Sequence, residues 1–222
     1  LRQLVRTRII PANLAANPHL SYARPFPGGL ALALCLDFPN TVTTVGNGHL
    51  EKYPIGLDEL YHWGQINTDN EAIDEHTTCG PFTGIAGESL FIASKAAHIA
   101  SLVSTLHIDA PHGLLFAIPD RSVLLYAPAD PTSPTHQFVS LVDYLRIDIL
   151  QRLHTMPARI LSKDLFYCSP DGTFGAITRS GHPDVQELFT NPDLDADRLV
   201  ELAVKNMNFF EGFRTRFYPS NM

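Results

Sequence analysis

The feature that constrains this fold most is a pair of apolar runs on either side of a proline turn. Residues 114–118 are continuously apolar, Pro119-Asp120-Arg121 interrupts them, and residues 123–126 resume as Val-Leu-Leu-Tyr. Proline fixes φ and aspartate bonds the backbone just ahead, so this spacing predicts a β-hairpin. Neither run alternates between apolar and polar residues. We therefore expect both strands to lie centrally in a sheet that is covered on both faces.

A long helix is predicted immediately before this hairpin, from about residue 88 to residue 106. Apolar residues recur there at steps of three and four and share one face, while polar residues share the opposite face. The apolar set is Ile92, Ala96, Ile99, Val103 and Leu106, and the polar set is Ser94, His98, Ser101 and Thr105. Glu88 and Ser89 suit a first turn. We expect a helix with one buried and one solvated face.

A second long helix is predicted after Ser133-Pro134, a cap followed by a first-turn proline. Shorter elements are predicted as strands at residues 30–36, 41–45, 160–168 and 174–178, and as helices at 1–10, 57–67 and 183–189. Asp195 is predicted to cap a last helix, with Leu199, Leu202, Ala203 and Phe210 on its inner face and Gly212 at its end. Residues 68–87 are predicted to be mostly loop.

The order of these elements predicts an α+β fold, in which hairpins build an antiparallel sheet that the two long helices cover. We expect a single domain over residues 1–222. Residues 1–27 are predicted to form an irregular N-terminal arm, and residues 180–222 a helical C-terminal extension. A chain of 222 residues with 45% hydrophobic and 18% charged residues can bury a core of its own.

Composition limits the classes of partner. The formal charge of -7 argues against nucleic acid and anionic membranes, both of which favour a positive face. No apolar run has the length of about 18 residues that a membrane span needs. Cys35, Cys79 and Cys168 are too few and too widely spaced for a disulfide framework, which favours a reducing, cytoplasmic location. No dinucleotide, haem, Walker or metalloprotease motif is present, so we expect no cofactor.

Part of the chain resembles a known family. The order Pro-Gly-Gly-Leu, an apolar strand, Asp37-Phe38-Pro39, a β-branched strand and Leu57-Asp58-Glu59-Leu60…Gly64…Asn67 resembles the YtpQ-like family of bacterial proteins of unknown function. The hairpin from Gly113 to Tyr126 is similar to a hairpin of that family. The resemblance covers roughly residues 27–174, departs from the family at Gly64, and implies a bacterial origin and a fold. It implies no activity and no catalytic residues.

The first candidate site is the stretch from Asp69 to Ser89. Gly84 and Gly87 lead into the predicted helix, where free N–H groups and Ser89 can bind an anion. Cys79 can have a lowered pKa there, and His76 can serve as its base. A solvated acidic loop explains the same residues, and a metal site built from Glu75, His76, Cys79 and His98 is a further alternative.

Two other groups of residues are candidates. His62 and Trp63 can line an aromatic ligand pocket. His98, on the polar face of its predicted helix, is a separate candidate for ligand binding. Asp109 can orient His112 for general base chemistry. Ordinary positions at the core edge, in solvent or in a turn are the alternative explanation of these residues.

The tail from Phe209 to Tyr218 mixes aromatic residues with Arg214 and Arg216. We expect it to pack on the protein itself or on a homodimer partner. Two function classes remain open. The protein is a soluble module that binds a small molecule or a protein partner, or it is a small cofactor-independent hydrolase, cyclase or isomerase. In the second case His76, Cys79, Asp109 and His112 are the candidate catalytic residues.

Overall fold

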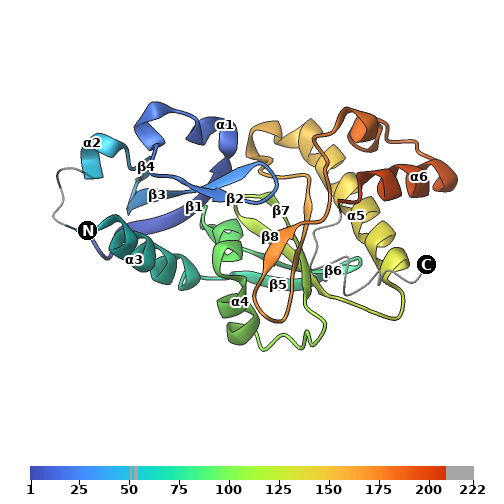
Figure 1. Ribbon diagram of the computed structural model, residues 1–222, viewed down its shortest axis with the longest axis horizontal. Coiled ribbons are helices and arrows are strands. Elements are labelled where there is room, and N and C mark those ends of the chain that lie inside the picture. The colour runs from blue at the N-terminus through green and yellow to red at the C-terminus, as the bar shows by residue number, and fades with distance from the viewer. Residues whose placement is uncertain (51, 53–54, 209–222) are drawn as a thin grey trace.

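The computed structural model describes residues 1–50, 52 and 55–208 and contains two antiparallel sheets, drawn side by side in Figure 1. In the smaller sheet β3 lies between β1 on one side and β2 and β4 on the other, and the larger sheet has the order β10-β9-β7-β8-β6-β5. The strands of the smaller sheet are β1 (Val5–Pro11), β2 (Arg24–Phe26), β3 (Leu30–Phe38) and β4 (Thr41–Thr44). Those of the larger sheet are β5 (Glu75–Cys79), β6 (Phe82–Ala86), β7 (Leu114–Asp120), β8 (Val123–Pro128), β9 (Leu165–Cys168) and β10 (Phe174–Ala176).

Helices pack on both sheets and complete the predicted α+β class. The α-helices are α1 (Ala12–Ala15), α2 (Asn47–Leu50), α3 (Leu57–Asp69), α4 (Ile99–Thr105), α5 (Pro134–Thr155) and α6 (Ala196–Asn206). The 3₁₀-helices are η1 (Pro18–Leu20), η2 (Ile92–His98), η3 (Pro157–Arg159) and η4 (Pro183–Phe189). None of the helices that the described residues form has the length and apolarity needed to cross a lipid bilayer.

The proline hairpin lies at the centre of the larger sheet, as predicted. β7 is paired with β9 and β8, and β8 is paired with β7 and β6. Pro119 has no N–H group for a ladder, and the register of the hairpin shifts between Ala117 and Asp120. A bulge at this point is how a central strand accommodates a proline.

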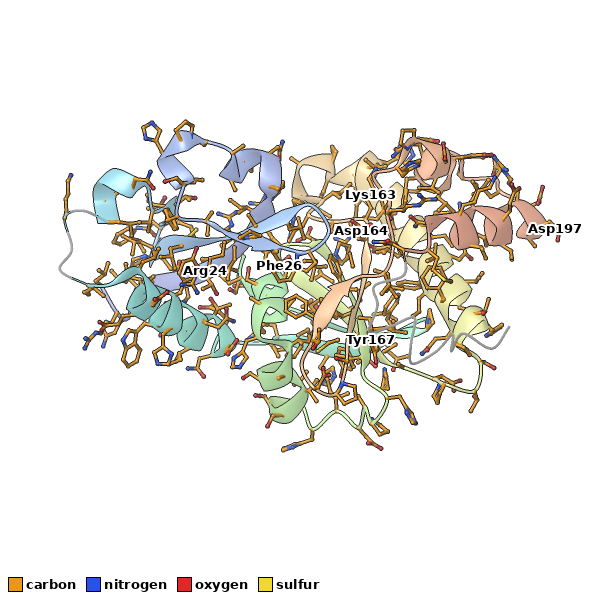
Figure 2. The ribbon with its side chains drawn as sticks, viewed as in Figure 1. Arg24, Phe26, Lys163, Asp164, Tyr167 and Asp197 are labelled. Carbon is orange, nitrogen blue, oxygen red and sulfur yellow. The ribbon has the colours of Figure 1, made fainter. Side chains whose placement is uncertain are left out.

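Both faces of the larger sheet are covered, which explains why its strands do not alternate in sequence. On one face Phe116 stacks on Phe166 at a ring separation of 5.1 Å, and Phe26 of the smaller sheet lies 6.1 Å from Phe166. Figure 2 shows Phe26 between the two sheets. On the other face Leu115 and Tyr167 are packed in one core with side chains of α5, η4 and α6. The hairpin is therefore the layer that joins the two cores.

Only one of the two predicted long helices is continuous. α5 runs for 22 residues, but the other helix begins at Ile92, is a 3₁₀-helix to His98, and continues as α4 only from Ile99. Ser94 was expected to face solvent, yet it is 1% exposed and its Oγ accepts the N–H of Ile9 at 3.0 Å. Ser94 is therefore buried because it bonds the free edge of β1. In a regular amphipathic helix the same side chain would face solvent.

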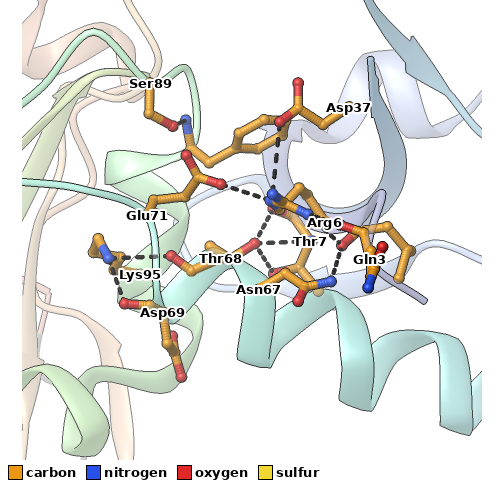
Figure 3. Close-up of polar contacts among 12 residues, drawn as sticks. Gln3, Arg6, Thr7, Asp37, Asn67, Thr68, Asp69, Glu71, Ser89 and Lys95 are labelled. Atoms are coloured by element: carbon orange, nitrogen blue, oxygen red, sulfur yellow. Dashed lines mark hydrogen bonds and ion pairs between the residues drawn. The ribbon is translucent and has the colours of Figure 1, made fainter. Parts of the chain in front are cut away.

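Lys95 makes a second buried polar contact in this segment (Figure 3). It is 3% exposed, and its Nζ donates to the carbonyl oxygens of Thr68 at 3.1 Å and Asp69 at 2.6 Å. These are the last carbonyls of α3, which have no partner inside the helix. Burial lowers the pKa of Lys95, while the negative charges of Asp69 and Glu71 oppose that shift.

The prediction of an N-terminal helix in an irregular arm is wrong. Residues 5–11 form β1, which pairs with β3 over its whole length. Val5, Thr7 and Ile9 are buried while Arg6 and Arg8 between them are partly exposed, which is the period of two of a strand. Residues 12–27 add α1, η1 and β2. The alternation was present in the sequence, and the arginines obscured it.

The prediction of a loop over residues 68–87 is also wrong. β5 and β6 form a hairpin there, from the pair Glu75–Ala86 to the pair Cys79–Phe82. Gly80 turns the hairpin with φ +59°, and a Cβ atom there would lie 2.6 Å from the ring of Tyr144. β5 is polar because it is the edge of its sheet and has four exposed residues. An edge strand of this kind carries little of the apolar alternation that identifies strands.

The last helix begins as predicted, and the side chain of Asp195 accepts the N–H of Arg198 at 2.8 Å. It ends at Asn206, earlier than predicted, because Met207 is extended and forms a bridge with Thr178. α6 and η4 share a core with α5, so this part of the predicted extension belongs to the body of the fold. Phe210, Gly212 and the rest of the aromatic tail lie outside the described residues.

Candidate functional site

The outer face of the smaller sheet forms the floor of a basic pocket. Arg8 and Ile10 of β1 lie opposite Ala33 and Ala31 of β3, and residues opposite each other on paired strands share a face. The neighbouring strand β4 contributes Thr44 to the same face, opposite the buried Cys35. Arg8, Ile10 and Thr44 of this face line the pocket, while Ala31 and Ala33 between them are buried.

The walls of this pocket come from α1, η1 and the loop around α2. Hydrogen bonds tie these segments together: the Nδ2 atom of Asn47 donates to the carbonyl of Pro18 at 2.8 Å and to Oγ of Ser21 at 2.9 Å. Tyr22 donates from its hydroxyl to the carbonyl of Val45 at 2.5 Å. The pocket is open to solvent and has a volume of about 800 Å³. Its lining residues are Arg8, Ile10, Leu14, Asn17, His19, Leu20, Thr44, Gly46, Gly48, His49 and Lys52.

The polar side chains of the basic pocket are mainly cations and donors. Arg8 and Lys52 are positively charged, and His19 and His49 add two imidazoles. No Asp or Glu occurs among the described residues of the lining, and Arg8 forms no ion pair with a described carboxylate. Burial raises the pKa of the Cys35 thiol beneath this surface, and the charge of Arg8 opposes the shift. The pocket therefore concentrates positive charge in an acidic protein.

One histidine of the basic pocket has a defined tautomer. Nδ1 of His49 accepts the N–H of Gly46 at 3.3 Å, so the hydrogen of the neutral ring is on Nε2. Asn17 uses Oδ1 to accept the N–H of His19, which leaves its Nδ2 as a donor. Three apolar side chains, Ile10, Leu14 and Leu20, complete the lining. Such a surface suits an organic anion with an apolar part.

A second, smaller pocket of about 310 Å³ lies where α3 meets β2 and the end of η2. Its lining residues are Arg24, Leu32, Tyr61, His62, Gln65, Ile66, Asp69, Ala97 and His98. Nδ1 of His98 lies 2.7 Å from Oδ2 of Asp69, and Nε2 of Gln65 donates to Oδ1 of the same carboxylate at 2.7 Å. Two residues of the sequence-based prediction, His62 and His98, therefore line one pocket. We call it the α3 pocket.

Trp63, predicted together with His62, points elsewhere. Its ring is 5.6 Å from that of His62 in an edge arrangement, but it packs against the core of the smaller sheet and under the guanidinium of Arg2. The structure thus brings His62 and His98 together and leaves Trp63 out of the α3 pocket.

His76 and Cys79 lie on the same strand but do not meet. They are three residues apart on β5, so their side chains point to opposite faces of the sheet. Nε2 of His76 is 2.8 Å from the hydroxyl of Tyr126, whereas the thiol of Cys79 is directed to the carbonyl of Thr77 at 3.7 Å. His76 therefore does not serve as a base for this thiol.

The amides near Gly87 are already bonded. The N–H of Gly87 donates to the carbonyl of Ser122 at 3.2 Å, and the N–H of Glu88 donates to the Asp74 carboxylate at 2.8 Å. Gly84 is paired within β6, and Oγ of Ser89 accepts the N–H of Phe91. A hollow here is lined by Asp74, Glu75, Ala86, Gly87 and Glu88. Its acidic lining does not favour the anion that the glycines were predicted to bind.

Asp109 and His112 are both exposed in the turn after α4, and no hydrogen bond or ion pair joins these two described side chains. The carbonyl of His112 accepts a hydrogen bond from the hydroxyl of Tyr167 at 2.8 Å. Among the described residues, no three His, Cys, Asp or Glu side chains gather closely enough to hold a metal ion. The metal alternative therefore gains no support from the described geometry.

The basic pocket was missed in the sequence because its basic residues come from three separate segments, β1, η1 and the loop around α2. Arg8, His19, His49 and Lys52 have no common spacing, and β1 was mistaken for a helix. The α3 pocket had a signal. His62, Gln65, Ile66 and Asp69 are spaced three, four and seven residues apart, which places them on one face of a helix.

Comparison with known protein families, with curated proteins and with solved structures finds no match. The resemblance to the YtpQ-like family stays a prediction. The fold and the two pockets define an α+β protein with two antiparallel sheets, a basic pocket on the outer face of one of them, and an Asp–His pair beside α3.

Proposed function

We propose that the protein binds a small organic anion in the basic pocket. The observation that carries this proposal is the lining: Arg8, Lys52 and two histidines occur without a described carboxylate, in a chain whose formal charge is -7. Like charges placed together repel each other, and an anion between them removes that repulsion. A carboxylate or a phosphate ester meets this requirement.

The size of the pocket and its apolar lining residues restrict the class of ligand that it can bind. A volume of about 800 Å³ lies within the range of small-molecule sites. Ile10, Leu14 and Leu20 offer contact to a hydrocarbon or ring, while Arg8, Lys52 and the Nε2–H group of His49 are suited to the acid group. An aromatic or short aliphatic acid, or its phosphate counterpart, therefore fits better than a bare inorganic ion.

Native mass spectrometry of the purified protein, compared with the same sample denatured, is the first experiment. A retained anion of a few hundred daltons would support the proposal and identify the ligand. Titration calorimetry then compares phenyl phosphate and benzoate with the neutral probe benzyl alcohol. We expect the two anions to bind, the neutral probe not to bind, and the affinity to fall as ionic strength rises.

The matched variants are Arg8→Gln in the pocket and Arg2→Gln on the surface, where Arg2 is paired with Glu59. Losing one charge-assisted hydrogen bond costs about 1.5–3 kcal/mol, or about 10- to 100-fold in Kd. We expect that loss for Arg8→Gln and an unchanged Kd for Arg2→Gln. Equal binding by both variants, or no binding of either anion by the wild type, would contradict the proposal.

The location, the oligomeric state, a protein partner and the enzyme alternative remain predictions. The thiols of Cys35, Cys79 and Cys168 are all free, which supports a reducing, cytoplasmic compartment. A homodimer and a protein partner remain predictions that the same mass spectra test. The alternative of a small cofactor-independent enzyme is favoured by a separate observation, the Asp69–His98 pair in the α3 pocket.

A further inference from the structure

We propose that the α3 pocket is a hydrolytic site in which His98 acts as a general base toward small carboxylic esters. This site is separate from the basic pocket and does not depend on its ligand. The inference rests on the position of one histidine, on the groups that fix its carboxylate partner, and on the residues that line the same cavity.

The break in the predicted helix positions His98. It is the last residue of η2 and caps α4 with a non-helical backbone, φ -134° and ψ 56°. In a continuous helix the side chain of His98 would lie on the face exposed to solvent. Instead, Nδ1 of the imidazole meets Oδ2 of Asp69, the last residue of α3, at 2.7 Å.

Asp69 is held from three directions. Its Oδ1 accepts a hydrogen bond from Gln65 at 2.7 Å, its Oδ2 faces His98, and its backbone carbonyl accepts one from the buried amine of Lys95 at 2.6 Å. The carboxylate side chain is only 18% exposed. A carboxylate fixed in this way keeps the hydrogen of a neutral imidazole on Nδ1 and leaves the Nε2 lone pair free to accept a proton. Asp69 is therefore a positioning residue.

The remaining lining residues suit an ester. Arg24 comes from β2 (Figure 2). Its guanidinium lies 3.8 Å above the ring of Tyr61 and is paired with Asp58. It supplies positive charge for a developing oxyanion. Leu32, Ile66 and Ala97 offer an apolar surface for the acyl group. A volume of about 310 Å³ suits a small ester.

The chemistry needs only water as a second reactant. Nε2 of His98 takes a proton from water as the water oxygen bonds to the ester carbonyl carbon, and the carbonyl electrons move onto its oxygen near Arg24. The C=O bond then re-forms, the C–O bond to the alcohol breaks, and the leaving oxygen takes the proton from Nε2. The products are a carboxylic acid and an alcohol, His98 is neutral again, and nothing is oxidised or reduced.

The test is hydrolysis of p-nitrophenyl acetate by the full chain. Exposed imidazoles cleave this ester without any site, so the control is His154→Asn, which removes another exposed histidine at the end of α5. We expect saturation kinetics in the wild type, a loss of at least 10-fold in kcat/KM for His98→Asn, and no change for His154→Asn. The side chain of His98 is 55% exposed, so its removal is compatible with folding, which circular dichroism checks.

The positioning role has its own readout. Asp69→Asn is expected to lower kcat about 10-fold or more with KM unchanged. If His98→Asn and His154→Asn retain equal rates, or if the wild type is no faster than free imidazole at ten times its concentration, the proposal fails. Phenyl phosphate binding by His98→Asn is measured in parallel. Retained binding with lost hydrolysis separates this site from the basic pocket.

Discussion

Asp120 ends β7 with a carboxylate that is only 1% exposed, and its replacement tests how the central hairpin is held. Oδ1 accepts hydrogen bonds from the N–H of Ser122 at 2.9 Å and from its hydroxyl at 2.8 Å. Oδ2 lies 3.3 Å from a guanidinium nitrogen of Arg152 and 2.9 Å from one of Arg159. The carboxylate therefore joins the turn of the hairpin to α5 and η3.

The cost of the substitution in unfolding free energy depends on which contacts Arg152 and Arg159 keep when the carboxylate is removed. Removing one member of a buried ion pair costs about 3–5 kcal/mol, because the other charge is left without compensation. Arg159 is 42% exposed and can be hydrated, and Arg152 keeps Asp148 at 2.6 Å. We therefore expect the lower end, about 3 kcal/mol, for Asp120→Ala. Asp120→Asn keeps one acceptor for Ser122 and should cost about 2 kcal/mol.

Equilibrium urea unfolding at pH 7 measures these costs. The matched control is Asp148→Asn, which removes an i,i+4 partner of Arg152 nearer the surface and should cost less than about 1 kcal/mol. If Asp120→Ala is no more destabilising than this control, the carboxylate does not hold the hairpin and the reasoning is wrong.

The same carboxylate predicts a pH dependence. Burial alone would raise the pKa of Asp120, but the hydrogen bonds from Ser122 and Arg159 and the charge of Arg159 leave it below its ordinary value. Its contribution to stability is therefore complete above its unfolded pKa of about 3.9 and is lost as the pH falls through the lower folded value. The difference in unfolding free energy between wild type and Asp120→Asn should shrink below about pH 4.

Two further predictions concern glycines and cysteines. Gly113 and Gly172 both have positive φ, but a Cβ at Gly113 would lie 2.5 Å from the carbonyl of Cys168, while nothing lies within 4 Å at Gly172. Gly172→Ala should cost about 1 kcal/mol and Gly113→Ala about 3 kcal/mol or more, read as the fall in Tm; equal falls would contradict the crowding. Burial raises the pKa of Cys35, and that of Cys168 to about 11, whereas Cys79 is only half-buried. A thiol reagent at pH 8 should label one cysteine quickly in the native protein and all three in urea, and rapid labelling of all three without urea would refute it.

The sequence predicted the elements whose side chains face a core on a regular period. The hairpin at residues 114–126, the continuous helix α5 and the cap at Asp195 all follow local rules of periodicity and capping. β1, the hairpin β5–β6 and the break at His98 do not. β1 has arginines on its outer face, β5 is a polar edge, and the break serves contacts with α3 and β1 that lie far away in sequence.

The candidate sites show the same limit. His62 and His98 were predicted as ligand-binding residues from composition and face, and they do line one pocket. Their partner Asp69 was named only as the start of an acidic stretch, since nothing local shows that the end of α3 meets the end of η2. The basic pocket depends on the packing of α1, η1 and the α2 loop over β1. That tertiary arrangement has no signature in any single segment.

The edge of β1 affects how the protein folds while it is being translated. The amides of Thr7 and Ile9 find their acceptors on Thr68 and Ser94, which follow 61 and 85 residues later in the chain. At 5–20 residues per second a ribosome needs roughly 4–17 s to add the second interval. During that time the nascent strand has an unprotected edge with alternating apolar residues, which can pair with another nascent chain. We therefore expect the yield of correctly folded protein to depend on the speed of translation between residues 9 and 94.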